Sequence, residues 1–284
     1  MLEEFVSKDM KTFLSTFLCI LAFNLSAQDI PYGYNDDAGA YFRVDEHTRL
    51  YYEVYGSGAP LIMLHGGVYG YIDEFGGLIP KLAEHFQVIC LGSRGHVKSD
   101  IGKAPYTYEQ RAKDAHKLMK HLGLEKATVL GFSDGGFGAY VMAAMYPEKV
   151  EKVVAMGAGD DPVKDSDPGY TYTAKELMAQ YPDYFKKRVD HMPEPERWDE
   201  SLKMLSELYN HSKVSKEVFV KIKCPVLVMS GDADEYSSPE RVLAAHSYIP
   251  KSQLSLIPGC GHVILGCNLP AVWASMKPFL GVGQ

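Results

Sequence analysis

Six short apolar runs, separated by stretches of helical periodicity, constrain the fold of this chain most. Runs built largely from Val, Ile and Leu, without polar alternation, are typical of strands buried on both faces of a parallel sheet. Their alternation with helices over 284 residues predicts an α/β fold with a mostly parallel, doubly wound sheet. The strands are expected at residues 61–64, 86–91, 127–130, 152–156, 225–229 and 253–257.

A hairpin is expected ahead of this pattern. Residues 40–44 and 50–55 alternate apolar and polar side chains around Asp45-Glu46-His47. Ligands of doubly wound sheets bind at the carboxyl ends of the strands, so the residues directly after each run are the place to look for chemistry. Helices are expected at residues 71–85, 107–122, 137–146, 239–247 and 269–280.

More than sixty residues separate two of the strands, and they are rich in Tyr and Met. They contain helical stretches at 174–181, 184–191 and 197–210 and no clear strand. An insertion of this size is more often a functional lid than an idle loop. The expected organisation is a core at 28–157, a helical lid at 158–221 inserted after the sixth strand, and a second part of the core at 222–284.

The N-terminus has the pattern of a secretory signal. Met10-Lys11 precedes an apolar run at 13–23, and small and polar residues follow it. The run is shorter than the roughly 20 residues that a membrane span needs. Residues 1–27 are therefore expected to be a signal peptide, with Met10 as an alternative start and cleavage after Ala27. This predicts an exported protein, periplasmic or secreted, without a stable membrane anchor.

Composition excludes several classes of function. The net charge of −7 offers no basic surface for nucleic acid, and a hydrophobic content of 46% is ordinary for a globular protein. No Cys/His spacing resembles a zinc site, and no metal or organic cofactor is implied. After the leader the cysteines are Cys90, Cys224, Cys260 and Cys267; the last two are the nearest pair for a disulfide, although buried free thiols are the commoner outcome.

The segment Gly131-Phe132-Ser133-Asp134-Gly135-Gly136 lies between an expected strand and an expected helix. A Ser flanked by Gly two residues away on each side, at a strand-to-helix turn, describes a nucleophile elbow. Ser133 is therefore the expected nucleophile, and it needs a base to take its proton and an acid to orient that base.

The order nucleophile, acid, base along the chain leaves His246 and His262 as candidate bases. His246 falls within an expected helix, whereas His262 follows a strand in a Gly-rich turn, so His262 is the expected base. The expected acid is Asp234, which lies deep enough in the loop after a strand to turn back toward His262. Asp232, better placed to cap the turn, and Asp160 or Asp161 remain alternatives.

An oxyanion that forms during acyl transfer needs preorganised donors. The backbone N–H of Asp134 at the start of a helix is one, and the loop His65-Gly66-Gly67-Val68 is expected to supply another. Gly67 is the expected contributor and Val68 the alternative; Val68 is also an expected substrate contact. His65 is expected to pin this loop and not to act in catalysis.

The motifs at His65-Gly66-Gly67, Ser93 to Asp100, the elbow, Gly231 to Asp234 and Gly259 to His262 together resemble the α/β-hydrolase superfamily. The resemblance implies that Ser133, Asp234 and His262 form a triad. This chain has Ser93 where the family usually has Asp, and Val97 where it usually has a second Gly. Both changes bear on the conformation of that loop.

Asp134, directly after the nucleophile, is similar to the biphenyl-hydrolase-like (valacyclovir hydrolase) branch, which implies hydrolysis of esters with a free α-amino group. Asp134 would then pair with a substrate ammonium; alternatively it only complements the helix dipole. The expected function is a serine hydrolase of small carboxylic esters. The alternatives are an aminopeptidase resembling proline iminopeptidases, although Val68-Tyr69-Gly70 departs from that family's pattern, and a non-catalytic ligand-binding protein on the same fold.

Overall fold

The computed structural model describes residues 30–161 and 169–283. The signal peptide expected at residues 1–27 lies outside the described residues. No described helix is long and apolar enough to cross a membrane.

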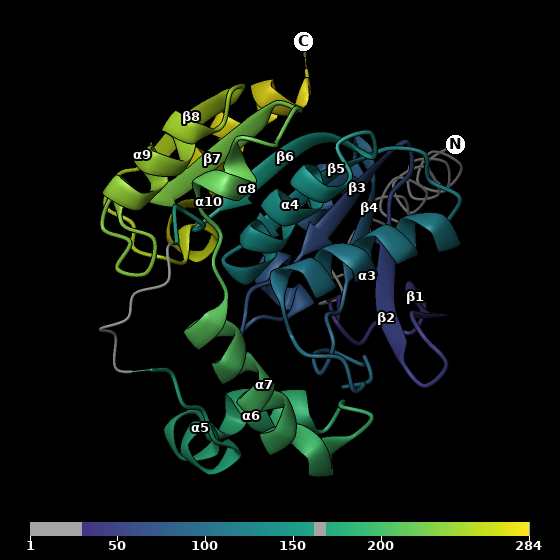
Figure 1. Cartoon of the computed structure of the whole chain (residues 1–284). Helices are drawn as coiled ribbons and strands as arrows, with labels where there is room; N and C mark the ends of the chain where they lie inside the picture. Colours follow the sequence, from purple (N-terminus) through teal and green to yellow (C-terminus); the bar gives the residue numbers. More distant parts are fainter. Residues whose placement is uncertain (1–29, 162–168, 284) are drawn as a thin grey trace, which may run out of the picture. The chain divides into compact units, whose positions relative to one another are not determined.

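An eight-stranded sheet forms the centre of the fold, with strand order β1-β2-β4-β3-β5-β6-β7-β8 (Figure 1). The hairpin strands pair antiparallel with each other, and β2 pairs antiparallel with β4. The remaining neighbours are parallel, as the unbroken apolar runs predict. The strands are β1 (Gly39–Arg43), β2 (Arg49–Tyr55), β3 (Ala59–Leu64), β4 (Phe86–Leu91), β5 (Ala127–Phe132), β6 (Val150–Met156), β7 (Val226–Gly231) and β8 (Ser252–Ile257).

Two hydrophobic cores lie on the two faces of the sheet. Alternate residues of β3, such as Ile62 and Leu64, pack with helices α3 (Tyr108–His121) and α4 (Asp134–Met145). Their neighbours Leu61 and Met63 pack on the other face with η1 (Ile72–Phe75), α2 (Ile79–Ala83) and α10 (Ile264–Leu280). Every residue of β5 and β7 is buried, so both strands are packed on both faces up to the loops that follow them.

Three helix predictions differ from the structure. The helix expected at 71–85 is divided into η1 and α2 because Gly76-Gly77 disfavour a continuous helix and Pro80, in the first turn of α2, favours a new start. The helix expected from residue 137 begins at Asp134, since the elbow geometry overrides the low helix propensity of Gly135 and Gly136. The last helix begins at Ile264 but is kinked at Asn268, whose side chain accepts the Ala271 N–H at 3.1 Å.

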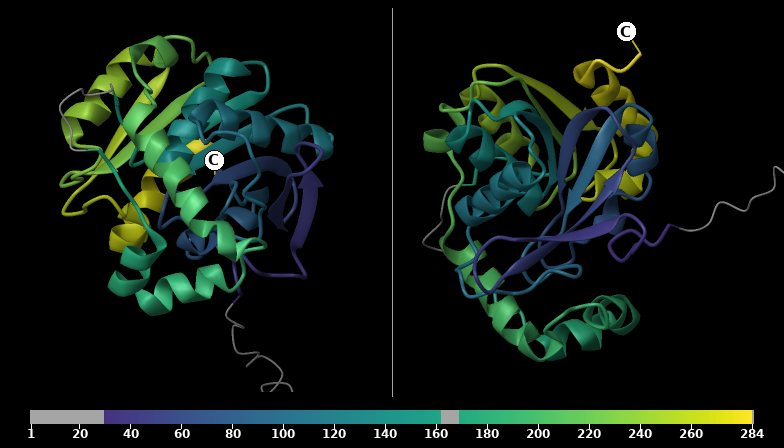
Figure 2. Two further views of the ribbon diagram at one scale, coloured as in Figure 1. Left: turned by 60° about the horizontal axis from the view of Figure 1, so that its bottom comes forward. Right: turned by 90° about the vertical axis from the view of Figure 1, so that its right-hand side faces the viewer.

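The inserted segment forms helices α5 (Ala174–Gln180), α6 (Pro182–Val189) and α7 (Trp198–His211), with η2 (Pro195–Arg197) between the last two. Figures 1 and 2 show these helices beyond one end of the sheet. The following short helix α8 (Lys216–Phe219) instead packs with the core, where the rings of Phe219 and Tyr140 lie 5.1 Å apart. We call α5, α6 and α7 the lid helices.

Candidate active site

The elbow holds Ser133 in a backbone conformation that residues other than glycine rarely adopt, with φ 52° and ψ −118°. The flanking glycines make this turn possible. A Cβ on Gly131 would lie 2.1 Å from the Gly135 oxygen, and one on Gly135 would lie 1.9 Å from the Leu64 oxygen. The residue types of the motif are thus required by close backbone approach as well as by the turn.

Ser133, His262 and Asp234 form a continuous hydrogen-bonded chain. The Ser133 Oγ lies 3.0 Å from Nε2 of His262. On the other side of the ring, Nδ1 lies 3.0 Å from each carboxylate oxygen of Asp234. A carboxylate accepts, so Nδ1 carries the proton and Nε2 is left to accept from the serine hydroxyl. This geometry allows His262 to remove the proton of Ser133.

Asp234 is 2% exposed and is satisfied on both oxygens. Its Oδ1 accepts the backbone N–H groups of Tyr236 and Ser237 at 2.9 and 2.8 Å, and Oδ2 accepts the Ser230 hydroxyl at 2.7 Å. Burial alone would raise the pKa of Asp234, but the hydrogen bond and charge of His262, with these other donors, lower it. Asp234 is therefore held ionised behind the imidazole.

Among the other candidate acids and the other candidate base, Asp232, Asp161 and His246 pair with groups outside the triad. Asp232 accepts the Gly259 N–H at 2.7 Å and so caps the turn. Asp161 pairs with Arg241, whose Nε donates to the backbone oxygen of Asp160 at 2.7 Å. His246 contacts Ser252 from helix α9 (Pro239–Tyr248). Of the four acids considered, Asp234 is the one in contact with His262.

A disulfide encloses the turn that presents His262. Cys260 and Cys267 are bonded, whereas Cys90 and Cys224 are free and buried. The bond joins the residues after β8 to the first turn of α10, with His262 between them. It restricts the conformations available to the His262 turn.

His65 pins the loop after β3, as its position predicts. Its Nε2 accepts the Ser93 N–H at 2.9 Å, so Nδ1 carries the proton and donates to the Gly66 oxygen at 2.8 Å. Full burial drives the pKa of His65 well below the usual value, which keeps the ring neutral. Because the backbone N–H of Ser93 makes this contact, the contact does not depend on which side chain stands at position 93.

The second departure from the family pattern, Val97, adopts φ 60° and is fully buried. This left-handed conformation is strained for a β-branched residue, and it is the one a glycine would adopt freely. The loop therefore keeps a glycine-like backbone with valine in place.

The amides of the His65 loop have different partners. The Gly66 N–H donates to Oε1 of Glu74 at 2.7 Å, and the Val68 N–H donates to the Tyr209 hydroxyl at 3.3 Å. Within the described residues, the Gly67 N–H has no hydrogen-bond acceptor. Of the two expected oxyanion donors in this loop, Gly67 is thus the amide that remains available.

The Asp134 side chain is buried against this same loop, with 5% exposure. It accepts the Tyr209 hydroxyl at 2.8 Å and the Tyr108 hydroxyl at 3.4 Å. A Cβ added to Gly67 would lie 2.5 Å from Oδ2 of Asp134, so only glycine fits there. Burial raises the pKa of Asp134, while the charge of Arg111 and the two hydroxyls oppose that rise.

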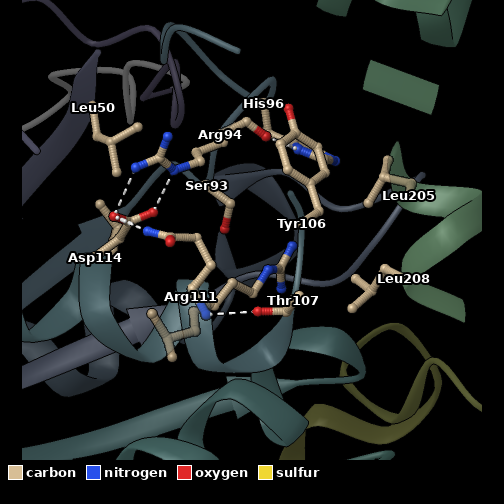
Figure 3. Close-up of a pocket in the computed structure, with 13 residues that line it drawn as sticks. Leu50, Ser93, Arg94, His96, Tyr106, Thr107, Arg111, Asp114, Leu205 and Leu208 are labelled. Atoms are coloured by element: carbon tan, nitrogen blue, oxygen red, sulfur yellow. Dashed lines mark hydrogen bonds and ion pairs between the residues drawn. The ribbon is translucent and has the colours of Figure 1, made fainter. Parts of the chain in front are cut away.

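Sequence reasoning missed four residues that surround the site: Glu74 on η1, Tyr108 and Arg111 on α3, and Tyr209 on α7. Figure 3 shows Arg111 among the residues lining a pocket, together with Ser93, His96 and the lid residues Leu205 and Leu208. The helical periodicity around each of them is explained equally well by packing, so no local signal identifies them. The described residues contain no cluster of His, Cys, Asp and Glu able to hold a metal ion.

A protein-family model, described as "alpha/beta hydrolase fold", matches residues 59–196. With the sheet and the elbow described above, the chain belongs to the α/β-hydrolase superfamily, and it is a hydrolase. It is 27% identical to the human serine hydrolase BPHL over 231 residues, which cover 76% of this chain and 77% of that protein. It is also 28% identical to a 2-hydroxy-6-oxo-6-phenylhexa-2,4-dienoate hydrolase of Burkholderia cepacia over 245 residues, 75% of this chain and 85% of the relative.

Solved structures share the fold. The enol-lactonase from Burkholderia xenovorans LB400 superposes with a TM-score of 0.69 at 21% identity, covering 85% of this chain and all of that one. A thermophilic esterase from Thermogutta terrifontis gives a TM-score of 0.66 at 22% identity, covering 86% of this chain and 98% of that one. At these identities the likeness concerns the fold alone.

Proposed function

We propose that this protein is a serine hydrolase that cleaves small carboxylic esters through an acyl-enzyme. The observation that carries the proposal is the chain of 3.0 Å contacts from Ser133 through His262 to Asp234. A serine hydroxyl is a weak nucleophile until a positioned base takes its proton, and this arrangement supplies that base. Similarity to the serine hydrolase BPHL supports the same reaction class.

In the acylation step, Ser133 Oγ attacks the ester carbonyl carbon while its proton moves to Nε2 of His262. Asp234, held ionised, stabilises the imidazolium that forms. When the tetrahedral intermediate collapses, the bond to the alcohol oxygen breaks and His262 returns the proton to that oxygen. Water then attacks the acyl-enzyme by the same route, giving the carboxylic acid and free Ser133.

The negative oxygen of the intermediate is stabilised, in this proposal, by the N–H groups of Gly67 and Asp134. Asp134 is the first residue of α4, so its amide has no partner within the helix and lies at the positive end of the dipole. Gly67 has the free amide of the facing loop. Val68, the alternative donor and a proposed substrate contact, has its amide directed to Tyr209.

For the substrate class, we propose esters with a free α-amino group as the first set to test. The support is the Asp134 carboxylate, which lies at the elbow and opposite Gly67. A substrate ammonium would have to replace a hydroxyl of Tyr108 or Tyr209 on that carboxylate. Comparing Asp134→Asn with the parent on an amino-acid ester and its des-amino analogue tests this. A selective loss on the amino-acid ester supports the ammonium contact, and an equal loss on both rules it out.

The direct test of the reaction is hydrolysis of a panel of p-nitrophenyl esters by the parent and by Ser133→Ala. The parent should turn over at least one ester, and Ser133→Ala should lose that turnover. Release of the N-terminal residue from peptides, without cleavage of esters, would favour the aminopeptidase alternative. Ligand binding without turnover would favour a binding protein on the same fold.

We also propose that the mature protein is exported. The leader pattern supports this, and so does the Cys260–Cys267 disulfide, because such bonds persist in oxidising compartments. N-terminal sequencing of the protein recovered from cell fractions tests it. A mature N-terminus near residue 28 in the periplasmic or secreted fraction is the expected result, and an intact leader in the cytoplasmic fraction would contradict it.

A further inference from the structure

We propose that Arg111 on α3 is a positioning residue of the oxyanion hole, which fixes the direction of the Gly67 N–H and balances the charge of Asp134. The inference rests on the proposed serine-hydrolase function, since it assigns Arg111 a part in stabilising the oxyanion. Arg111 does not touch the Ser133–His262–Asp234 chain; it acts through the backbone of the His65 loop.

Arg111 holds two successive carbonyl groups of that loop. Its Nη1 donates to the His65 oxygen at 3.0 Å, and its Nη2 donates to the Gly66 oxygen at 3.3 Å. The Gly66 oxygen also accepts from Nδ1 of His65 at 2.8 Å. Two donors, one of them charged, thus fix the orientation of the Gly66 carbonyl.

The Gly66 carbonyl belongs to the same peptide group as the Gly67 N–H. In a trans peptide these two groups point in opposite directions, and the described chain has no cis peptide. Fixing the carbonyl therefore fixes the N–H on the far side of the plane. Hydrogen bonding at the carbonyl also polarises the peptide group, which makes its N–H a stronger donor.

The sequence places Arg111 for this task through a helix cap. The Thr107 side chain accepts the Gln110 N–H at 2.9 Å, and the Thr107 carbonyl accepts the Arg111 N–H at 3.0 Å. Arg111 therefore lies in the first turn of α3, beside the loop that it holds. The planar guanidinium offers two donors in a fixed fork, which a lysine ammonium cannot match.

Charge gives Arg111 its second role. An ionised Asp134 next to a forming oxyanion would oppose catalysis unless a cation offsets it. The guanidinium and the Asp134 carboxylate lie against the same loop: Arg111 holds the His65 and Gly66 oxygens, and a Cβ on Gly67 would lie 2.5 Å from Oδ2 of Asp134. Burial raises the pKa of Asp134, and the charge of Arg111 acts against that rise. The offsetting cation is thus present in the protein itself, whether or not the substrate carries an ammonium.

The test compares Arg111→Gln, Arg111→Lys and the control Lys113→Gln, which removes a positive charge from the exposed face of the same helix. The readouts are kcat and KM for a p-nitrophenyl ester and the rate of labelling of Ser133 by a fluorophosphonate. We expect Arg111→Gln to lower kcat and the labelling rate by about 10²-fold with little change in KM, because the interaction is made in the transition state. Arg111→Lys, which keeps the charge without the fork, should fall between Arg111→Gln and the parent.

A double variant separates the two roles. If Arg111 offsets the charge of Asp134, adding Asp134→Asn to Arg111→Gln should recover about tenfold of the lost labelling rate; no recovery would overturn the charge role. Thermal melting of each variant identifies losses of activity that come from unfolding. If Arg111→Gln is unfolded, the comparison of Arg111→Lys with the parent decides the question. If Ser133 of the parent is not labelled, the proposed function fails. If the parent is labelled, and the Arg111 variants are labelled as fast as the parent and as Lys113→Gln, the inference about Arg111 is wrong and the proposed function stands.

Discussion

Two aspartates are buried in the active-site region, and their surroundings drive their pKa values in opposite directions. Asp234 is hydrogen-bonded to His262 and accepts two backbone N–H groups of its own loop, and its pKa is lowered. Asp134 is reached by the hydroxyls of Tyr108 and Tyr209, and its pKa is raised. Burial raises the pKa of both carboxylates, but only at Asp234 do the hydrogen bond and charge of His262, with the other donors, outweigh it.

The difference has opposite consequences for stability. Asp234, with its lowered pKa, stabilises the folded protein above the usual pKa of a carboxyl group, and this contribution is lost as the pH falls through the lowered value. Asp134, with its raised pKa, keeps its proton longer in the folded state, so its contribution is complete below the usual carboxyl pKa and is lost as the pH rises from there through the raised value. The Asp234 site is built from β7 and the turns after β7 and β8, whereas the Asp134 site depends on hydroxyls from α3 and from the lid helix α7.

The largest expected effect comes from removing the charge at Asp234. Asp234→Asn should lower kcat by about 10⁴-fold, because an amide neither stabilises the imidazolium nor selects the required tautomer. Steady-state kinetics on a p-nitrophenyl ester measure the change. Asp232→Asn is the matched control, because Asp232 lies in the same loop but bonds to the Gly259 N–H. An equal loss in Asp232→Asn would show that the loop, and not the carboxylate behind His262, is responsible.

The next effect concerns the disulfide beside the Asp234 site. Replacing Cys260 and Cys267 together by Ala should lower the free energy of unfolding by about 2 kcal/mol, because the bond closes a short loop in the unfolded chain. Activity should fall as well, since His262 lies within that loop. Chemical denaturation and kinetics measure both. Unchanged activity would show that β8 and α10 position His262 without the bond.

A change at Tyr209 tests the Asp134 side of the comparison. Tyr209→Phe removes the hydroxyl that donates to Asp134 and accepts from the Val68 N–H, and should cost about 1 to 3 kcal/mol of stability. Tyr172→Phe is the matched control, because its ring lies 6.0 Å from that of Tyr209. If the two variants lose the same stability in thermal melts, the contact between the Tyr209 hydroxyl and Asp134 contributes nothing specific.

The smallest expected effect is a change in pH dependence. Burial raises the pKa of Glu74 to about 8. Between the usual carboxyl pKa and this value the folded protein holds a proton that the unfolded chain has released, so stability falls as the pH rises through this range. Melting temperatures between pH 5 and 8 should decline less steeply in Glu74→Gln. Glu148→Gln, on the exposed surface, should keep the parent slope; parent slopes in both variants would contradict the role given to Glu74.

The sequence was informative where a function depends on neighbours along the chain. The apolar runs predicted the parallel strands, and the order of the motifs singled out Ser133, Asp234 and His262, because each follows the carboxyl end of a parallel strand. The helix boundaries expected near Gly76-Gly77 and Gly135-Gly136 were wrong. Glycine disfavours a helix, but tertiary contacts decide whether the helix is interrupted, as at Gly76-Gly77, or formed, as at Gly135-Gly136.

The residues around Asp134 could not be predicted in this way. Arg111 and Tyr209 reach the His65 loop from α3 and α7, across long separations in the sequence. An arginine or tyrosine on an amphipathic helix has no feature that distinguishes a contact with a catalytic loop from ordinary packing. The choice between Gly67 and Val68 likewise needed the partner of each amide, which only the folded chain provides.

Locating the residue that a fluorophosphonate modifies tests most directly whether Ser133 is the nucleophile. Intact mass and peptide mapping of the labelled full chain should show one adduct, on the peptide containing Ser133. The adduct should be absent from Ser133→Ala and should form much more slowly in His262→Ala, because the base that activates the serine is gone. An unlabelled parent, or an adduct on another residue, would contradict the assignment of Ser133 as the nucleophile.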